Sequence, residues 1–130
     1  MADYKVVKVS DVPDQGPNLG IAPNVEIRFL RNDLGCESCG VSYMRLAPNH
    51  RQASGHRHKV QEEIYMLVSG SARAKVGDDV VEMEPWTAVR VPNDTTRAFE
   101  AGPEGAEFVA VGAPNTGPGD TIDDPEFWTD

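Results

Sequence analysis

Residues 55–70 read Gly55-His56-Arg57-His58-Lys59-Val60-Gln61-Glu62-Glu63-Ile64-Tyr65-Met66-Leu67-Val68-Ser69-Gly70, and this stretch decides the fold. Two histidines lie one residue apart, and a carboxylate follows five positions after the second. Alternate side chains of a β-strand project from one face, so we expect His56 and His58 to point the same way. If the strand that Glu63 opens pairs with theirs, two imidazoles and one carboxylate meet, as in the facial sites of non-haem iron and related divalent metals.

The composition favours one turn-rich β domain. A chain of 130 residues is long enough to bury a core, and its 12 glycines and 10 prolines disfavour a helical protein. The net charge of −9 disfavours nucleic acid and anionic membranes as partners. There is no apolar run of membrane-spanning length, and residues 1–5 show no secretory h-region, so we expect a cytoplasmic protein.

Alternating apolar and polar residues between turn signals predict many short strands and no helix of useful length. The expected strands are an edge strand at 4–9, then 25–30, 41–47, two within the histidine segment, 71–76, 80–84, 87–91, 96–100 and 106–111. Such spacing indicates a sandwich or barrel. Residues 113–130 lack a strand pattern, and we expect Phe127 and Trp128 to dock on the domain or on a second subunit.

The histidine segment resembles the first motif of the cupin superfamily. His56-x-His58, four residues, Glu63, six residues and Gly70 fit that motif in spacing and type. Glu62 fits a shorter spacing, but only Glu63 leaves six residues before Gly70. The motif's leading glycine falls at His50, where this sequence departs from the pattern.

The second cupin motif is present only in a looser form. Asp79, Pro85 and Thr87 stand at its first glycine, its proline and its second glycine. Residues 91–97, Val-Pro-Asn-Asp-Thr-Thr-Arg, put Arg97 where the resemblance implies the last metal histidine. The resemblance implies an all-β fold, a cupin jelly-roll β-barrel (double-stranded β-helix). It predicts a single domain over 1–130, with a lead-in at 1–21, a core barrel at about 22–112 and a tail at 113–130.

The resemblance implies four metal ligands, and this chain offers three: His56, His58 and Glu63. Two outcomes stay open. In the first, a divalent ion (Fe, Mn, Ni or Zn) is held by three side chains, and Arg97 points at the mouth and binds an anionic substrate. In the second, the ion is lost and Arg97 points inward to pair with Glu63. A cation beside the ion would repel it, so the two cannot share one position.

The leading hypothesis is a metal-dependent enzyme acting on a small polar or anionic metabolite. Its candidate catalytic residues are Tyr65 and Arg97. Arg97 would orient the substrate, and Tyr65 would donate a proton or form a hydrogen-bonded wall, with Phe99 shaping the pocket. The resemblance adds that cupins include dioxygenases, sugar-phosphate isomerases and epimerases. The alternative is a metal-free binding or sensor module. In either case we expect a homodimer through sheet packing.

Three further residue sets carry secondary predictions. His50 is expected at the barrel rim, with replacement of the missing fourth ligand as its second interpretation. Cys36 and Cys39 are interpreted as two thiols in a loop, with a redox-sensitive disulfide as the alternative. Trp86 is expected to pack, because it follows Pro85 in a bend.

Overall fold

The computed structural model describes residues 2–130 and confirms the all-β fold. Among these residues there are eight strands: β1 (Val25–Phe29), β2 (Gly40–Leu46), β3 (Gly55–His58), β4 (Glu62–Val76), β5 (Asp79–Met83), β6 (Ala88–Val91), β7 (Arg97–Ala113) and β8 (Thr121–Asp124). The helical segments are short: η1 (Val9–Asp11), α1 (Arg31–Leu34) and η2 (Pro118–Asp120). None of these helices has the length and apolar character needed to cross a membrane.

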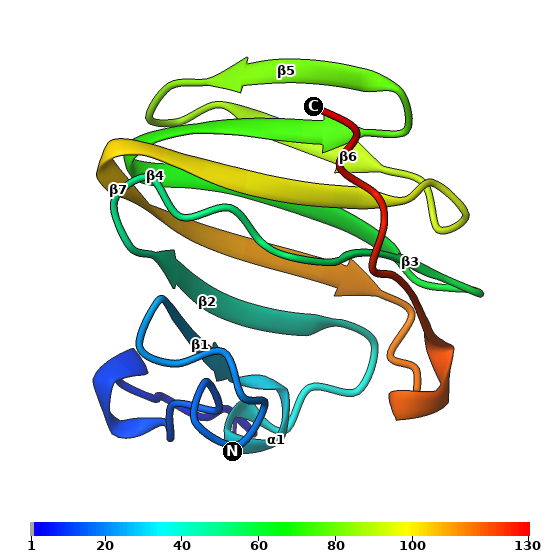
Figure 1. Cartoon of the computed structure of the whole chain (residues 1–130). Helices are drawn as coiled ribbons and strands as arrows, with labels where there is room; N and C mark the ends of the chain where they lie inside the picture. Colours follow the sequence, from blue (N-terminus) through cyan, green and yellow to red (C-terminus); the bar gives the residue numbers. More distant parts are fainter. Residues whose placement is uncertain (1) are drawn as a thin grey trace.

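Two long strands, β4 and β7, form the centre of the fold and run antiparallel side by side (Figure 1). The first part of β4 pairs with the last part of β7 and with β6, and the last part of β4 pairs with the first part of β7 and with β5. On its other side β7 pairs with β2, which pairs with β1, and with β3, which pairs with β8. The sheet therefore curls on itself, with β3 and the start of β4 at one end.

Each long strand replaces two shorter strands that the sequence predicts. The predicted break at Gly70 is an irregularity within β4, where the register with β7 shifts on either side of Ser69–Gly70. Gly70 has φ of +83°, and a Cβ there would lie 2.0 Å from the carbonyl oxygen of Gly105. Glycine is required at this position because the bulged backbone of β4 touches that of β7.

The core lies between the facing halves of the curled sheet. Its fully buried members are mostly apolar side chains that alternate along the strands, as a half-buried sheet requires. The largest fully buried apolar side chains are Leu46, Leu67, Val91, Phe99 and Phe108, and among the described residues the one fully buried charged side chain of comparable size is that of Arg97. The ring of Phe99 lies 4.6 Å from that of Tyr65 and 5.0 Å from that of Phe108, so an aromatic row supports the inner surface of β4.

Both ends of the chain differ from the predicted pattern. No strand forms at residues 4–9, whose side chains are largely exposed; η1 begins at Val9 instead. The tail does contain a strand, β8, which forms by backbone pairing with β3 although only Ile122 in it is apolar. The predicted docking of the tail aromatics on the domain is confirmed, since Phe127 is 8% exposed and the indole Nε1 of Trp128 donates to the Gln52 carbonyl at 2.7 Å.

Trp86 does not pack as predicted. Its side chain is 73% exposed, and its backbone has φ of +71° in the bend between β5 and β6. The amide of Trp86 donates to the Leu67 carbonyl. This backbone hydrogen bond fixes the bend and turns the indole toward solvent.

Candidate metal centre

The structure brings His56, His58 and Glu63 together at one end of the curled sheet. β3 supplies the two histidines and the start of β4 supplies the carboxylate. One ligand atom of each residue lies within 4.8 Å of the other two. The two imidazole rings are perpendicular, with centroids 5.1 Å apart. Glu62 faces outward and pairs with Arg90, as alternation along the strand requires.

A single oxygen, Glu63 Oε1, is the centre of this group. It lies 2.8 Å from His58 Nε2 and 3.5 Å from His56 Nε2, and it accepts a hydrogen bond of 2.6 Å from the Tyr65 hydroxyl. Burial of Glu63 opposes ionisation, but the hydrogen bonds from His56 and Tyr65 and the charges of both histidines outweigh it. The pKa of Glu63 consequently falls to about 2. Glu63 is therefore a carboxylate at neutral pH, the form that binds a cation.

Tyr65 lies next to the group on the inner face of β4. Its side chain is 4% exposed, and its hydroxyl is 3.4 Å from His56 Nε2 as well as bonded to Glu63. Burial and the negative charge of Glu63 raise the pKa of Tyr65 well above its ordinary value, although the charge of Arg97 opposes them. Tyr65 thus keeps its proton and acts as a hydrogen-bond donor.

Arg97 points inward, as in the second of the two outcomes left open by the sequence, and does not lie at the mouth as in the first. Its side chain is fully buried, with Nη1 3.8 Å from Glu63 Oε1 and Nη2 donating to the Pro92 carbonyl at 2.9 Å. The cause is its position at the start of β7, where it is in register with His56 and faces the interior. Its Nε has no hydrogen-bond partner among the described residues.

Two of the three separations between the donors are close to those found around one metal ion. Two donor atoms that each lie about 2.1 Å from a common ion are roughly 3.0–3.4 Å apart in a tetrahedral or octahedral shell. The distances from Glu63 Oε1 to His58 Nε2 and His56 Nε2, 2.8 and 3.5 Å, bracket that range. The side chain of His56 is 29% exposed, against 10% for His58 and 14% for Glu63. The group is therefore open to solvent on the His56 side.

Asp120 is a member of this neighbourhood that the sequence did not indicate. Its Oδ2 lies 3.1 Å from His58 Nδ1, on the side of the ring opposite Glu63. Burial opposes its ionisation, but hydrogen bonds from the Gln61 amide, the Thr116 hydroxyl and the Val60 amide lower its pKa below the usual value. No spacing signal links Asp120 to His58, because 62 residues separate them and the segment before β8 has no strand pattern.

The remaining candidates lie apart from the group. His50 is not a member of it within residues 2–130; its backbone bonds to Ala47 and Ala101 near the start of β3. Cys36 and Cys39 are free thiols in the loop before β2. Burial and the neighbouring Cys39 raise the pKa of Cys36, so its thiol is protonated at neutral pH.

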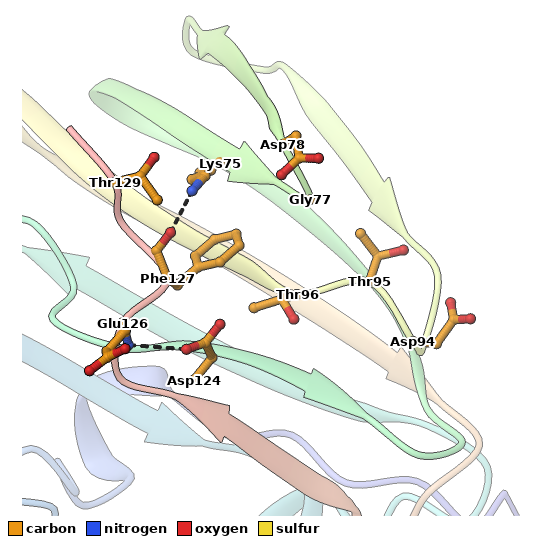
Figure 2. Close-up of a pocket in the computed structure, with 10 residues that line it drawn as sticks. All are labelled: Lys75, Gly77, Asp78, Asp94, Thr95, Thr96, Asp124, Glu126, Phe127 and Thr129. Atoms are coloured by element: carbon orange, nitrogen blue, oxygen red, sulfur yellow. Dashed lines mark hydrogen bonds between the residues drawn. The ribbon is translucent and has the colours of Figure 1, made fainter.

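A groove of about 510 Å³ is lined by none of the three donors. Its lining residues are drawn in Figure 2. It lies where the β4–β5 turn, the loop before β7 and the C-terminal tail meet. Lys75 points into the tail, where its Nζ donates to the Phe127 carbonyl and lies 4.3 Å from the Phe127 ring. The groove and the donor group are thus separate features of the molecule.

Comparisons with known proteins agree with this architecture. A family model described as "Cupin domain" matches residues 42–112, which include all three donors and Arg97. A search of curated proteins gave no match.

Solved structures with the same fold are numerous. A cupin protein from Bacteroides fragilis has a TM-score of 0.71 at 20% identity, over 88% of this chain and 86% of that chain. Oxalate decarboxylase from Bacillus subtilis has a TM-score of 0.76 at 21% identity; the match covers 89% of this chain but only 31% of the decarboxylase. KdgF from Halomonas sp. has a TM-score of 0.63 at 12% identity, over 88% of both chains. At these identities the likeness shows the fold alone.

Proposed function

The chain belongs to the cupin domain family, and on that premise we propose that it is a divalent-metal-dependent enzyme acting on a small polar or anionic metabolite. One observation carries the proposal: His56 Nε2 and His58 Nε2 both lie within 3.5 Å of the same carboxylate oxygen of Glu63. Two imidazoles and a carboxylate form a ligand set that Fe, Mn, Ni or Zn accepts. The ion would act as a Lewis acid or, if it is iron, support chemistry with dioxygen.

The chain's own residues would shape the reaction around such an ion. A substrate would approach on the His56 side, because that imidazole is the most exposed of the three donors. Tyr65 holds Glu63 in place through its hydroxyl and keeps a proton within 3.4 Å of His56 Nε2. Arg97 adds a fixed positive charge behind the site, which favours anionic ligands at its mouth. These roles for Tyr65 and Arg97 are part of the proposal.

Metal content tests this function directly. The purified protein is dialysed against metal-free buffer, reloaded with each candidate ion and measured by elemental analysis. We expect about one ion per chain in the wild type and in His50→Ala, whose imidazole lies outside the group. His56→Ala and Glu63→Gln should each lose it. A wild type that retains no ion from any of the four metals would overturn the proposal.

A second candidate function, a metal-free binding module, is favoured by the position of Arg97. Its guanidinium is fully buried and 3.8 Å from Glu63 Oε1, the geometry of a cation that takes the place of a metal charge. This module would bind its ligand without an ion. Thermal stability that chelator leaves unchanged, together with no bound ion, would support it.

We also propose that two copies associate through the outer face of the sheet. Ile64 and Val111 lie opposite each other on β4 and β7 and are 42% and 38% exposed. Val41 lies opposite Val111 on β2, which extends this apolar surface across three strands. A second copy of the same face would remove these side chains from water. The cytoplasmic location stays a prediction.

A further inference from the structure

The imidazole of His58 lies between two carboxylates, and only one of them belongs to the donor group. Its Nε2 is 2.8 Å from Glu63 Oε1, and its Nδ1 is 3.1 Å from Asp120 Oδ2. Both residues are buried, with His58 8% and Asp120 7% exposed. Asp120 therefore contacts the His58 ring at Nδ1, on the side opposite Glu63.

The carboxylate of Asp120 is also held by hydrogen bonds from groups other than His58. Its Oδ1 accepts from the Val60 amide at 2.8 Å, and its Oδ2 accepts from the Gln61 amide at 3.2 Å and the Thr116 hydroxyl at 3.0 Å. Its own carbonyl accepts from the Lys59 amide at 2.9 Å. These contacts join η2 to the turn between β3 and β4, so the carboxylate has one position relative to the ring.

This acid comes from a part of the chain beyond the matched family segment. The cupin model covers residues 42–112, whereas Asp120 ends η2, directly before β8 pairs with β3. In the register of these strands, His58 faces Thr121 and His56 faces Asp123. The tail therefore adds both a strand beside the histidines and a carboxylate behind one of them.

We propose that Asp120 is a positioning residue for His58, a conclusion that rests on the metal-dependent function above. In this arrangement the Nδ1–H of His58 would donate to Asp120, so that Nε2, which lies 2.8 Å from Glu63 Oε1, is the ring nitrogen that a metal ion would take. A carboxylate behind a metal-bound imidazole fixes its tautomer and ring orientation and strengthens the ligand. The tail thus completes the support of a ligand set that lies wholly within the family segment.

The test compares Asp120→Asn with Asp79→Asn, the same chemical change at an exposed acid of β5 that is not next to the histidines. Zinc affinity is measured by competition with a chromophoric chelator. We expect Asp120→Asn to weaken zinc binding by about 10- to 100-fold and Asp79→Asn to leave it unchanged. Equal affinity in wild type and Asp120→Asn would overturn the proposal.

Imidazole nitrogen NMR of the wild type provides a readout that a purely structural role would not move. The His58 Nδ1–H resonance should be strongly downfield and slow to exchange, and it should move upfield in Asp120→Asn but not in Asp79→Asn. A wild type in which His58 Nδ1 carries no proton would overturn the proposal even if Asp120→Asn failed to fold. Failure of the wild type to bind zinc would instead count against the proposed enzyme, and the NMR result would still decide the role of Asp120.

Discussion

His56 and Arg97 are register partners in the antiparallel pair of β3 and β7. Arg97 Nη1 lies 3.5 Å from the His56 carbonyl oxygen and 3.8 Å from Glu63 Oε1. A permanently charged guanidinium therefore occupies the level of the sheet where the cupin resemblance implies a neutral fourth imidazole. The affinity for a metal ion therefore depends on having arginine rather than histidine at position 97.

Arg97→His should tighten metal binding. The substitution removes a buried positive charge near the ion and supplies a nitrogen where the family motif has one, so we expect an affinity gain of about 10-fold or more. The dissociation constant for zinc or manganese would be measured by chelator competition. Arg90→His is the matched control, because Arg90 is exposed on β6 and pairs with Glu62. Weaker binding by a folded Arg97→His variant would contradict the prediction.

Glu63 should make the stability of the metal-free protein depend on acid pH. Its pKa is lowered from 4.5 to about 2 in the folded chain, so its stabilising contribution is complete above pH 4.5 and is lost as pH falls toward 2. The loss should be about 3 kcal/mol. Urea unfolding in chelator at several pH values would measure it as the difference between wild type and Glu63→Gln. Parallel pH profiles for the two proteins would show that Glu63 has no such role.

Tyr65→Phe should destabilise the fold and spare the metal stoichiometry. It removes a buried hydrogen bond of 2.6 Å to a charged oxygen, which should reduce the free energy of unfolding by about 2 kcal/mol. Tyr43→Phe is the matched control, because its hydroxyl bonds to Glu107 at 2.7 Å on the more exposed outer face. We expect a smaller loss there. If a folded Tyr65→Phe variant lost the metal, the prediction that the stoichiometry is spared would be wrong.

Ile64→Arg should separate the proposed dimer. A charge on the outer face of β4 would have to be buried against the second copy, which opposes association. Light scattering after size exclusion would report a mass of two chains for the wild type and of one for the variant. Val80→Arg on β5, a residue 51% exposed, provides the control. A wild type that elutes as a single chain would rule the dimer out.

The convergence of His56, His58 and Glu63, which are close together in the chain, was predicted from the sequence. His58 and Glu63 are five residues apart, and alternation sets the face to which each side chain points. The strands β3 and β4 do not pair with each other as expected from the sequence; each pairs with β7 instead. The inward orientation of the Arg97 side chain could not be predicted from neighbouring residues. It depends on the pairing of β7 with β3, where His56 lies 41 residues earlier in the sequence. The position of Asp120 depends on a tail strand that pairs only through its backbone.

The fold, too, was predicted where it depends on neighbouring residues and not where it depends on distant ones. Alternation and turn residues predicted most strands, since both are local properties. Gly70 was expected to end a strand, but β4 continues through it, because a register shift against β7 absorbs the extra residue. Trp86 was expected to pack, but the positive φ of its bend points the indole outward. Neither result is encoded in the residues next to it.

The three donors lie within eight consecutive residues, from His56 to Glu63. Closing so short a loop around an ion costs little entropy, so the unfolded chain would also chelate. An ion that binds both states stabilises the native one only by the difference in affinity. Added metal should therefore raise the melting temperature by less than its affinity for the folded protein implies, and ion capture can precede the pairing of the long strands.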